Sequence, residues 1–121
     1  MIIALWITAI FLTLVYVLSG VSKTFRSKAA LQPQMAYVED FAAWQVKAIG
    51  VVELLGALGV ILPLATGIAP VVTAIAAIGL VLVQVVAVAV HVRRNEGKSV
   101  PVNLALLLLA AAVVVLRFAT L

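Results

Sequence analysis

The stretch WQVKAIGVVELLGALGVILP, from Trp44 to Pro63, decides the fold because it is apolar enough to cross a bilayer yet contains Lys47 and Glu53. A helix rises about 1.5 Å per residue, which places Glu53 about 13 Å beyond Trp44, near the middle of a hydrocarbon layer about 30 Å thick. An ionised carboxylate at that depth costs about 2.5 kcal/mol or more. We therefore expect Glu53 to face other helices and to carry a proton, unless Lys47 or Lys23 reaches it.

The composition of the chain places it among membrane proteins. Of its 121 residues, 67% are hydrophobic and 10% are charged, which is far more apolar than a soluble domain. Four apolar segments are long enough to cross a bilayer as helices: residues 1–19, 44–63, 70–90 and 102–119. These segments use most of the chain, so we predict an all-α fold, a four-helix transmembrane bundle in a single domain over residues 1–121.

The distribution of charge predicts how the spans are oriented. Seven of the eight Lys and Arg residues lie in or next to two connecting segments, residues 23–43 and 92–101, whereas the turn at 64–69 carries no charge. Basic connecting segments are retained in the cytoplasm. We therefore expect a multi-pass protein of the cell membrane with segments 23–43 and 92–101 in the cytoplasm and both termini outside.

The connection between the first two spans has a pattern of its own. Apolar residues recur in it at helical spacing: Leu31, Met35, Val38 and Phe41 or Ala42. We expect a short amphipathic helix that lies against the cytoplasmic surface of the membrane, with an irregular loop as the alternative. Glu39 and Asp40 precede the second span, where acidic side chains favour a helix N-terminus, so they are candidates to cap it.

Polar residues on three of the spans are predicted to meet at one depth. Tyr16 lies about 10 Å inward from Lys23 on the same face of the first span. Gln84 lies about 10 Å inward from His91 along one side of the third span. These depths match that of Glu53, so we predict a pocket with Tyr16, Glu53 and Gln84 at its inner end.

The mouth of this pocket is predicted nearer the cytoplasmic surface, at Lys23, Lys47, His91 and Asn103. A buried carboxyl group beside a tyrosine suits proton transfer, so the candidate catalytic residues are Glu53, Tyr16 and His91. The candidate ligand-binding residues are Lys23, Lys47, Gln84 and Asn103. Purely structural roles stay open: packing for Tyr16, an interhelical hydrogen bond for Gln84, a helix-end position for His91 and membrane anchoring for both lysines.

Three stretches resemble the DoxX-like family over nearly the whole chain: GVSKTF at Gly20–Phe25, KAIGVVELLGALGVILP at Lys47–Pro63, and AAIGLVLVQVVAVAVHVRR at Ala76–Arg94. The residues that match its recurrent features are Gly20, Lys23, Lys47, Gly50, Glu53, Gly56, Gly59 and His91. The resemblance implies a four-helix membrane protein whose relatives are associated with thiosulfate:quinone oxidoreductase and with oxidative-stress membrane complexes. It also implies a lipophilic ligand or a membrane partner near redox chemistry, with a quinone as the candidate cofactor.

Three functional interpretations remain open. The first is a homo-oligomer or membrane-complex subunit that binds a quinone or another lipophilic small molecule around Glu53. The second is a membrane enzyme in which a protonated Glu53, with Tyr16 nearby, acts as the acid on an epoxide or prenyl-type substrate. The third is a small proton-coupled transporter. Small multidrug-resistance transporters carry their membrane glutamate in the first helix, however, and the first span here has no acidic residue.

Other classes of function are excluded by what the sequence lacks. The chain has no cysteine, so its own side chains perform no dithiol chemistry. It has no cluster of metal ligands, no phosphate-binding glycine loop and no nucleophile–base pair, which excludes the common hydrolases. The net charge of +4 belongs to segments that face anionic lipid rather than to a surface that binds nucleic acid.

Overall fold

The computed structural model describes residues 1–33 and 35–121. Its four long helices are α1 (Ile2–Phe25), α3 (Ala43–Thr66), α4 (Val71–Arg93) and α5 (Val100–Thr120), and each is long and apolar enough to cross a bilayer. Between α1 and α3 lie a short helix, α2 (Lys28–Leu31), and a 3-10 helix, η1 (Ala36–Asp40). The predicted all-α architecture of four spans with a short helical connection is confirmed.

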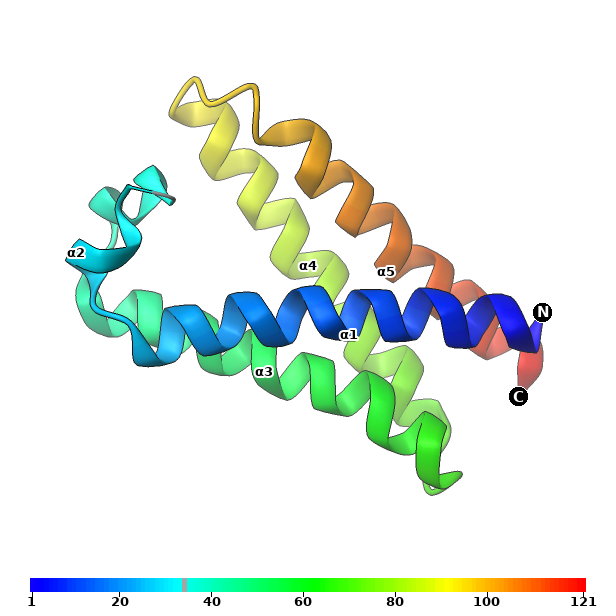
Figure 1. The fold of residues 1–121 in the computed structure, drawn as a ribbon. Helices are drawn as coiled ribbons and strands as arrows, with labels where there is room; N and C mark the ends of the chain where they lie inside the picture. Colours follow the sequence, from blue (N-terminus) through cyan, green and yellow to red (C-terminus); the bar gives the residue numbers. More distant parts are fainter. Residues whose placement is uncertain (34) are drawn as a thin grey trace.

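The four long helices pack as two pairs that cross each other (Figure 1). Helix α1 lies along α3, and α4 lies along α5, while α1 also contacts α5 and α3 also contacts α4. The two pairs diverge toward the end of the molecule that carries α2 and the α4–α5 turn. Both chain termini lie at the opposite end, where the pairs converge.

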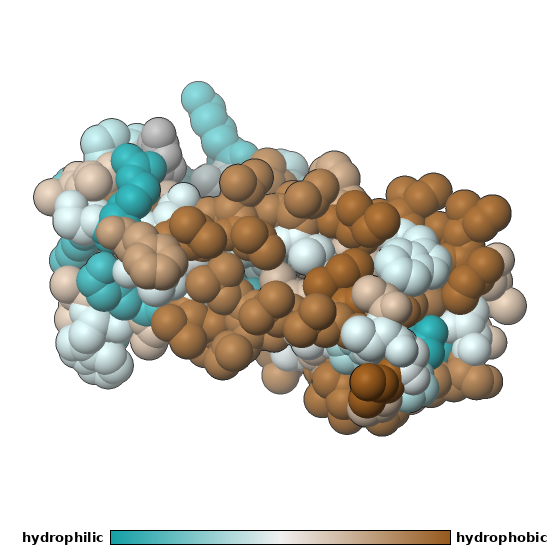
Figure 2. Space-filling view, turned by 60° about the horizontal axis from the view of Figure 1, so that its bottom comes forward, coloured by the Kyte–Doolittle hydropathy of each residue, from teal (hydrophilic) through white to brown (hydrophobic). Residues whose placement is uncertain are grey.

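An apolar core runs between the four long helices. It is formed by residues that recur at helical spacing in each of them: Leu5, Ala9, Leu12, Ala57, Val60, Ala77, Leu80, Ala110 and Val113. On the face that Figure 2 shows, hydrophobic side chains cover most of the surface as well, and hydrophilic side chains gather toward the end near α2. An exterior this apolar suits contact with lipid.

Helix α1 continues six residues beyond its predicted end at residue 19. The sequence Ser19-Gly20 resembles a helix terminus, but Gly20 is buried inside the helix against α3. A Cβ atom at Gly20 would lie 2.7 Å from Leu54 Cγ and 2.9 Å from the Gly50 carbonyl oxygen. Gly20 therefore allows two membrane helices to approach closely, and it does not end α1.

The connection between α1 and α3 folds as two short pieces rather than one continuous amphipathic helix. Helix α2 ends at Leu31, two residues before Pro33, because proline has no backbone N–H with which to continue the helical hydrogen bonds. Leu31 and Val38 are fully buried and pack with Val46 of α3. The apolar face that was predicted to rest on the membrane therefore covers the end of the bundle instead.

Candidate ligand-binding site

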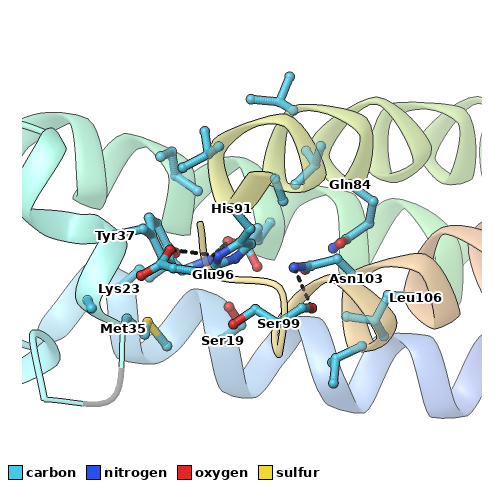
Figure 3. Close-up of a pocket in the computed structure, with 18 of the residues that line it drawn as sticks. Ser19, Lys23, Met35, Tyr37, Gln84, His91, Glu96, Ser99, Asn103 and Leu106 are labelled. Atoms are coloured by element: carbon cyan, nitrogen blue, oxygen red, sulfur yellow. Dashed lines mark hydrogen bonds and ion pairs between the residues drawn. The ribbon is translucent and has the colours of Figure 1, made fainter. Parts of the chain in front are cut away.

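A cavity of about 1070 Å³ lies between the two helix pairs at the end that carries α2 and η1. All four long helices line it, together with residues from the segments 33–41 and 95–99, and Figure 3 shows the side chains that surround it. Most of its lining is apolar. The polar side chains in it include Tyr16, Ser19, Lys23, Tyr37, Glu53, Gln84, His91, Glu96 and Asn103.

An ion pair between Lys23 and Glu53 is the most buried charge pair of the site. The Lys23 Nζ atom donates a hydrogen bond to Glu53 Oε1 at 2.5 Å, and the two side chains are 12% and 3% exposed. The close approach of α1 and α3 at Gly20 and Gly50 brings the last turn of α1 beside the middle of α3. Lys23 therefore reaches Glu53. A protonated Glu53 was expected only if neither Lys23 nor Lys47 could reach it, and this condition is not met.

A second polar pair joins α1 to α4 at the inner end of the cavity. Gln84 Nε2 donates a hydrogen bond to the Tyr16 hydroxyl, and that hydroxyl donates to the Leu80 carbonyl oxygen at 3.5 Å. Both side chains are buried. The Gln84 Oε1 atom has no hydrogen-bond partner among the described residues, so the inner end retains one free acceptor.

His91 is held at the mouth of the cavity by the turn that ends α4. Asn95 takes a left-handed conformation with φ of 58°, and the Glu96 N–H returns to the His91 carbonyl oxygen at 2.8 Å. This Schellman-type ending places the Glu96 carboxylate against the imidazole, with Nδ1 and Oε1 3.0 Å apart. The Tyr37 ring of η1 packs edge-on against the His91 ring, with the two ring centres 5.4 Å apart, so an aromatic contact joins η1 to α4 at the mouth.

Six of the seven predicted site residues line the cavity, and Lys47 does not. Lys47 Nζ is directed toward α1, where it donates to the Thr24 carbonyl oxygen at 2.9 Å. Asn103 donates to the Ser99 carbonyl oxygen at 3.0 Å, and Figure 3 shows Asn103 and Gln84 directed into the same space. The structure thus brings the predicted residues of the inner end together, while their roles remain predictions.

Two residues of the site were missed by the sequence analysis, Tyr37 and Glu96. Tyr37 lies between Lys23 and His91, with Lys23 Nζ 5.5 Å from the centre of its ring. Its position in an amphipathic segment predicted only a membrane contact. Glu96 could have been found from Asn95, which directly precedes it and follows Arg94. Asparagine is common where a helix ends in a left-handed turn, and such a turn brings the next residue back toward the helix.

The short segment that contains η1 is fastened over the mouth by ion pairs to the end of α4. Arg94 lies 2.8 Å from Asp40 and 3.6 Å from Glu39, and these contacts join η1 to the α4–α5 turn. The hydrogen bond with the Asp40 carboxylate is the main cause that raises the pKa of Arg94. Glu39 and Asp40 therefore do not cap α3, and the prediction that they would is wrong. At that end the Gln45 side chain accepts a hydrogen bond from the Ala42 N–H.

Four apolar helices of bilayer-spanning length, with a cavity between them that several polar side chains line, define a multi-pass membrane protein. The chain belongs to the DoxX-like family, whose family model matches residues 7–113. The match contains all six of the predicted residues that line the cavity. Comparisons with curated proteins and with solved structures found no match.

Proposed function

We propose that this protein binds a lipophilic small molecule with a polar head group, such as a quinone, in the cavity between its helix pairs. The observation that carries the proposal is the placement of a polar cluster, Lys23–Glu53 and Tyr16–Gln84, at one end of a mostly apolar cavity. Small-molecule sites have this composition, with an apolar wall and a few convergent polar groups. The cavity volume of about 1070 Å³ is slightly above the range of about 300 to 1,000 Å³ that such sites occupy, so the cavity has room for a small molecule.

Stability alone does not account for the polar cluster. Replacing a buried ion pair by apolar residues of similar size is often neutral or stabilising, so a bundle of this kind holds together without one. Val52 on α3 and Leu82 and Val86 on α4 line the cavity and are more than half exposed. An alkyl chain that leaves the cavity past these side chains meets lipid, which suits a ligand that stays in the membrane.

The proposal is tested by titrating decylubiquinone into the protein in lipid nanodiscs, with protein-free nanodiscs as the baseline for partition into lipid. We expect saturable binding to the native chain and binding at least about tenfold weaker in Glu53→Gln, a loss of about 1.4 kcal/mol. The amide keeps the shape of the side chain but removes the charge. We expect Glu53→Gln to stay folded, as judged by circular dichroism.

Thr73→Val is the matched control for this experiment. Thr73 is buried on α4 and donates to the Val60 carbonyl oxygen at 2.9 Å, but it does not line the cavity, so the variant should bind as the native chain does. If Glu53→Gln unfolds as readily as Glu53→Leu, the carboxylate is structural and the proposal fails. Mass spectrometry of the lipophilic molecules that copurify with the chain provides an unbiased second observation.

The two alternative functions give different results in the same preparation. An acid catalyst donates a proton from Glu53, whereas Glu53 here accepts a hydrogen bond from Lys23. Conversion of an epoxide-bearing prenyl substrate that disappears in Glu53→Gln would favour the enzyme. Proton release on adding a cationic amphiphile would favour the transporter. Assembly as a homo-oligomer or with a redox-associated membrane complex stays a prediction, supported by the family resemblance alone.

We also propose that the mouth of the cavity faces the cytoplasm, since seven of the eight Lys and Arg residues lie at that end. Single cysteines at Lys28, Lys98 and Ala65 test this orientation, because the native chain has no cysteine to interfere. In intact cells a membrane-impermeant maleimide should label position 65 and leave positions 28 and 98 unlabelled until the membrane is opened. Labelling of 28 and 98 with protection of 65 contradicts the orientation.

A further inference from the structure

We propose that the inner end of the cavity selects a ligand whose polar group donates a hydrogen bond. The ligand class is then a lipophilic hydroxyl compound, such as a phenol or the hydroquinone form of a quinone, in preference to its ketone or ether counterpart. This inference rests on the proposed function and states which chemical form the site prefers. It follows from which atoms accept the hydrogen bonds that Tyr16 and Gln84 donate.

A tyrosine hydroxyl has one hydrogen to donate, and Tyr16 directs it to the Leu80 carbonyl oxygen. The Tyr16 oxygen is then an acceptor, which is why the amide nitrogen of Gln84 faces it. Because this arrangement turns the nitrogen of the Gln84 amide toward Tyr16, the amide oxygen is directed away from it.

The Gln84 Oε1 atom is buried and has no partner among the described residues. The residue is 4% exposed, and a buried polar atom of this kind is normally hydrogen-bonded. Gln84 lines the cavity, and Figure 3 shows its polar end directed into the space that Asn103 also faces. A ligand that fills this end displaces any water there, so a ligand that supplies a donor to this oxygen is favoured over one that does not.

A hydroxyl group meets this requirement and a carbonyl or ether oxygen does not. A hydroxyl donates to Gln84 Oε1 and still accepts a hydrogen bond through its own lone pairs, whereas a ketone or ether oxygen only accepts. An acceptor placed against Gln84 Oε1 leaves that oxygen without a partner and brings two sets of lone pairs together. The site therefore distinguishes the protonated, reduced form of a quinone-like head group from its oxidised form.

The test compares 4-dodecylphenol with 4-dodecylanisole, which share the ring and the alkyl chain and differ only by a methyl group on the oxygen. Both are titrated into the native chain in lipid nanodiscs, with protein-free nanodiscs as the baseline. We expect the phenol to bind at least about tenfold more tightly than the anisole, equivalent to about 1.4 kcal/mol. The Thr73→Val control should keep the same ratio.

Two variants assign this preference to Gln84. In Gln84→Leu the ratio of the two affinities should fall to about one, because the acceptor is gone. In Tyr16→Phe the Gln84 amide nitrogen loses its partner and becomes available to the ether oxygen. Binding of the anisole should therefore strengthen, and the ratio of the two affinities should move toward one. The two substitutions lie on different helices. If one variant does not fold, the other still provides the test.

Equal binding of the two compounds by the native chain, or tighter binding of the anisole, overturns this inference while the proposed lipophilic site stands. A native ratio that Gln84→Leu and Tyr16→Phe both leave unchanged also overturns it. If decylubiquinone and both phenol derivatives bind no better than they bind to empty nanodiscs, the proposed function fails as well. The three probes therefore separate failure of the preference from failure of the site.

Discussion

Gly50→Ala is expected to destabilise the bundle by about 2 to 3 kcal/mol, the upper range for forcing extra volume into a packed interior. A Cβ atom at Gly50 would lie 2.7 Å from Thr24 Oγ1, 2.8 Å from Lys23 Cβ and 2.8 Å from the Thr24 backbone nitrogen. A backbone atom cannot rotate away, so α1 must shift from α3. The measurement is unfolding by sodium dodecyl sulfate in mixed micelles, followed by tryptophan fluorescence.

Gly79→Ala provides the matched control for this substitution. Gly79 is in α4, and a Cβ atom there meets no other atom within 4 Å. Alanine also favours a helix over glycine by about 1 kcal/mol, so this variant should be as stable as the native chain or slightly more stable. Equal losses of stability in the two variants would show that the close approach of α1 and α3 does not explain the effect.

Lys23→Met is expected to cost about 3 to 5 kcal/mol, because it leaves the carboxylate of Glu53 buried without its cation. Glu53→Gln should cost only about 1 kcal/mol. Its amide still accepts a hydrogen bond, and Lys23 lies two residues from the end of α1, where its stem can turn toward water. The double variant should recover much of the loss seen in Lys23→Met, which measures the coupling between the two side chains.

Lys47→Met is the control that separates the effect of losing a buried ion pair from the effect of losing a lysine charge. Lys47 is also a lysine at this end of the bundle, but it is exposed and donates only to a backbone carbonyl oxygen. Its replacement should change the unfolding free energy by no more than about 0.5 kcal/mol. The same detergent titration applies, and a loss in Lys23→Met no larger than in Lys47→Met would rule out a stabilising role for the ion pair.

The four spans could be predicted because length and hydropathy alone decide whether a helix crosses a bilayer. The ends of the helices could not be predicted as well, since Gly20 serves packing in one context and ends helices in many others. The same limit applies to α3, which continues past Pro63 and ends only where Gly67 takes a left-handed conformation with φ of 73°. Boundaries depend on neighbours that are distant in the sequence.

The inner end of the site was predicted by depth, and depth follows directly from the regular rise of a helix. Tyr16, Glu53 and Gln84 therefore lie around one cavity as expected. Direction around the helix axis was the weaker part of the prediction: Lys47 lies about 120° from Glu53 around α3 and points to a different neighbour. Tyr37 was missed because the amphipathic pattern of its segment predicted only a contact with the membrane surface.

The contact between Arg94 and Asp40 has a geometric consequence for the helices on either side. Helices α3 and α4 are joined at one end by the short turn around Gly67, and at the other end the ion pair links the residues that flank them, 40 and 94. The two helices thus form a closed ring, completed by a noncovalent cross-link. The short stretch from Asp40 to Ala43 therefore limits how far apart α3 and α4 can lie at that end.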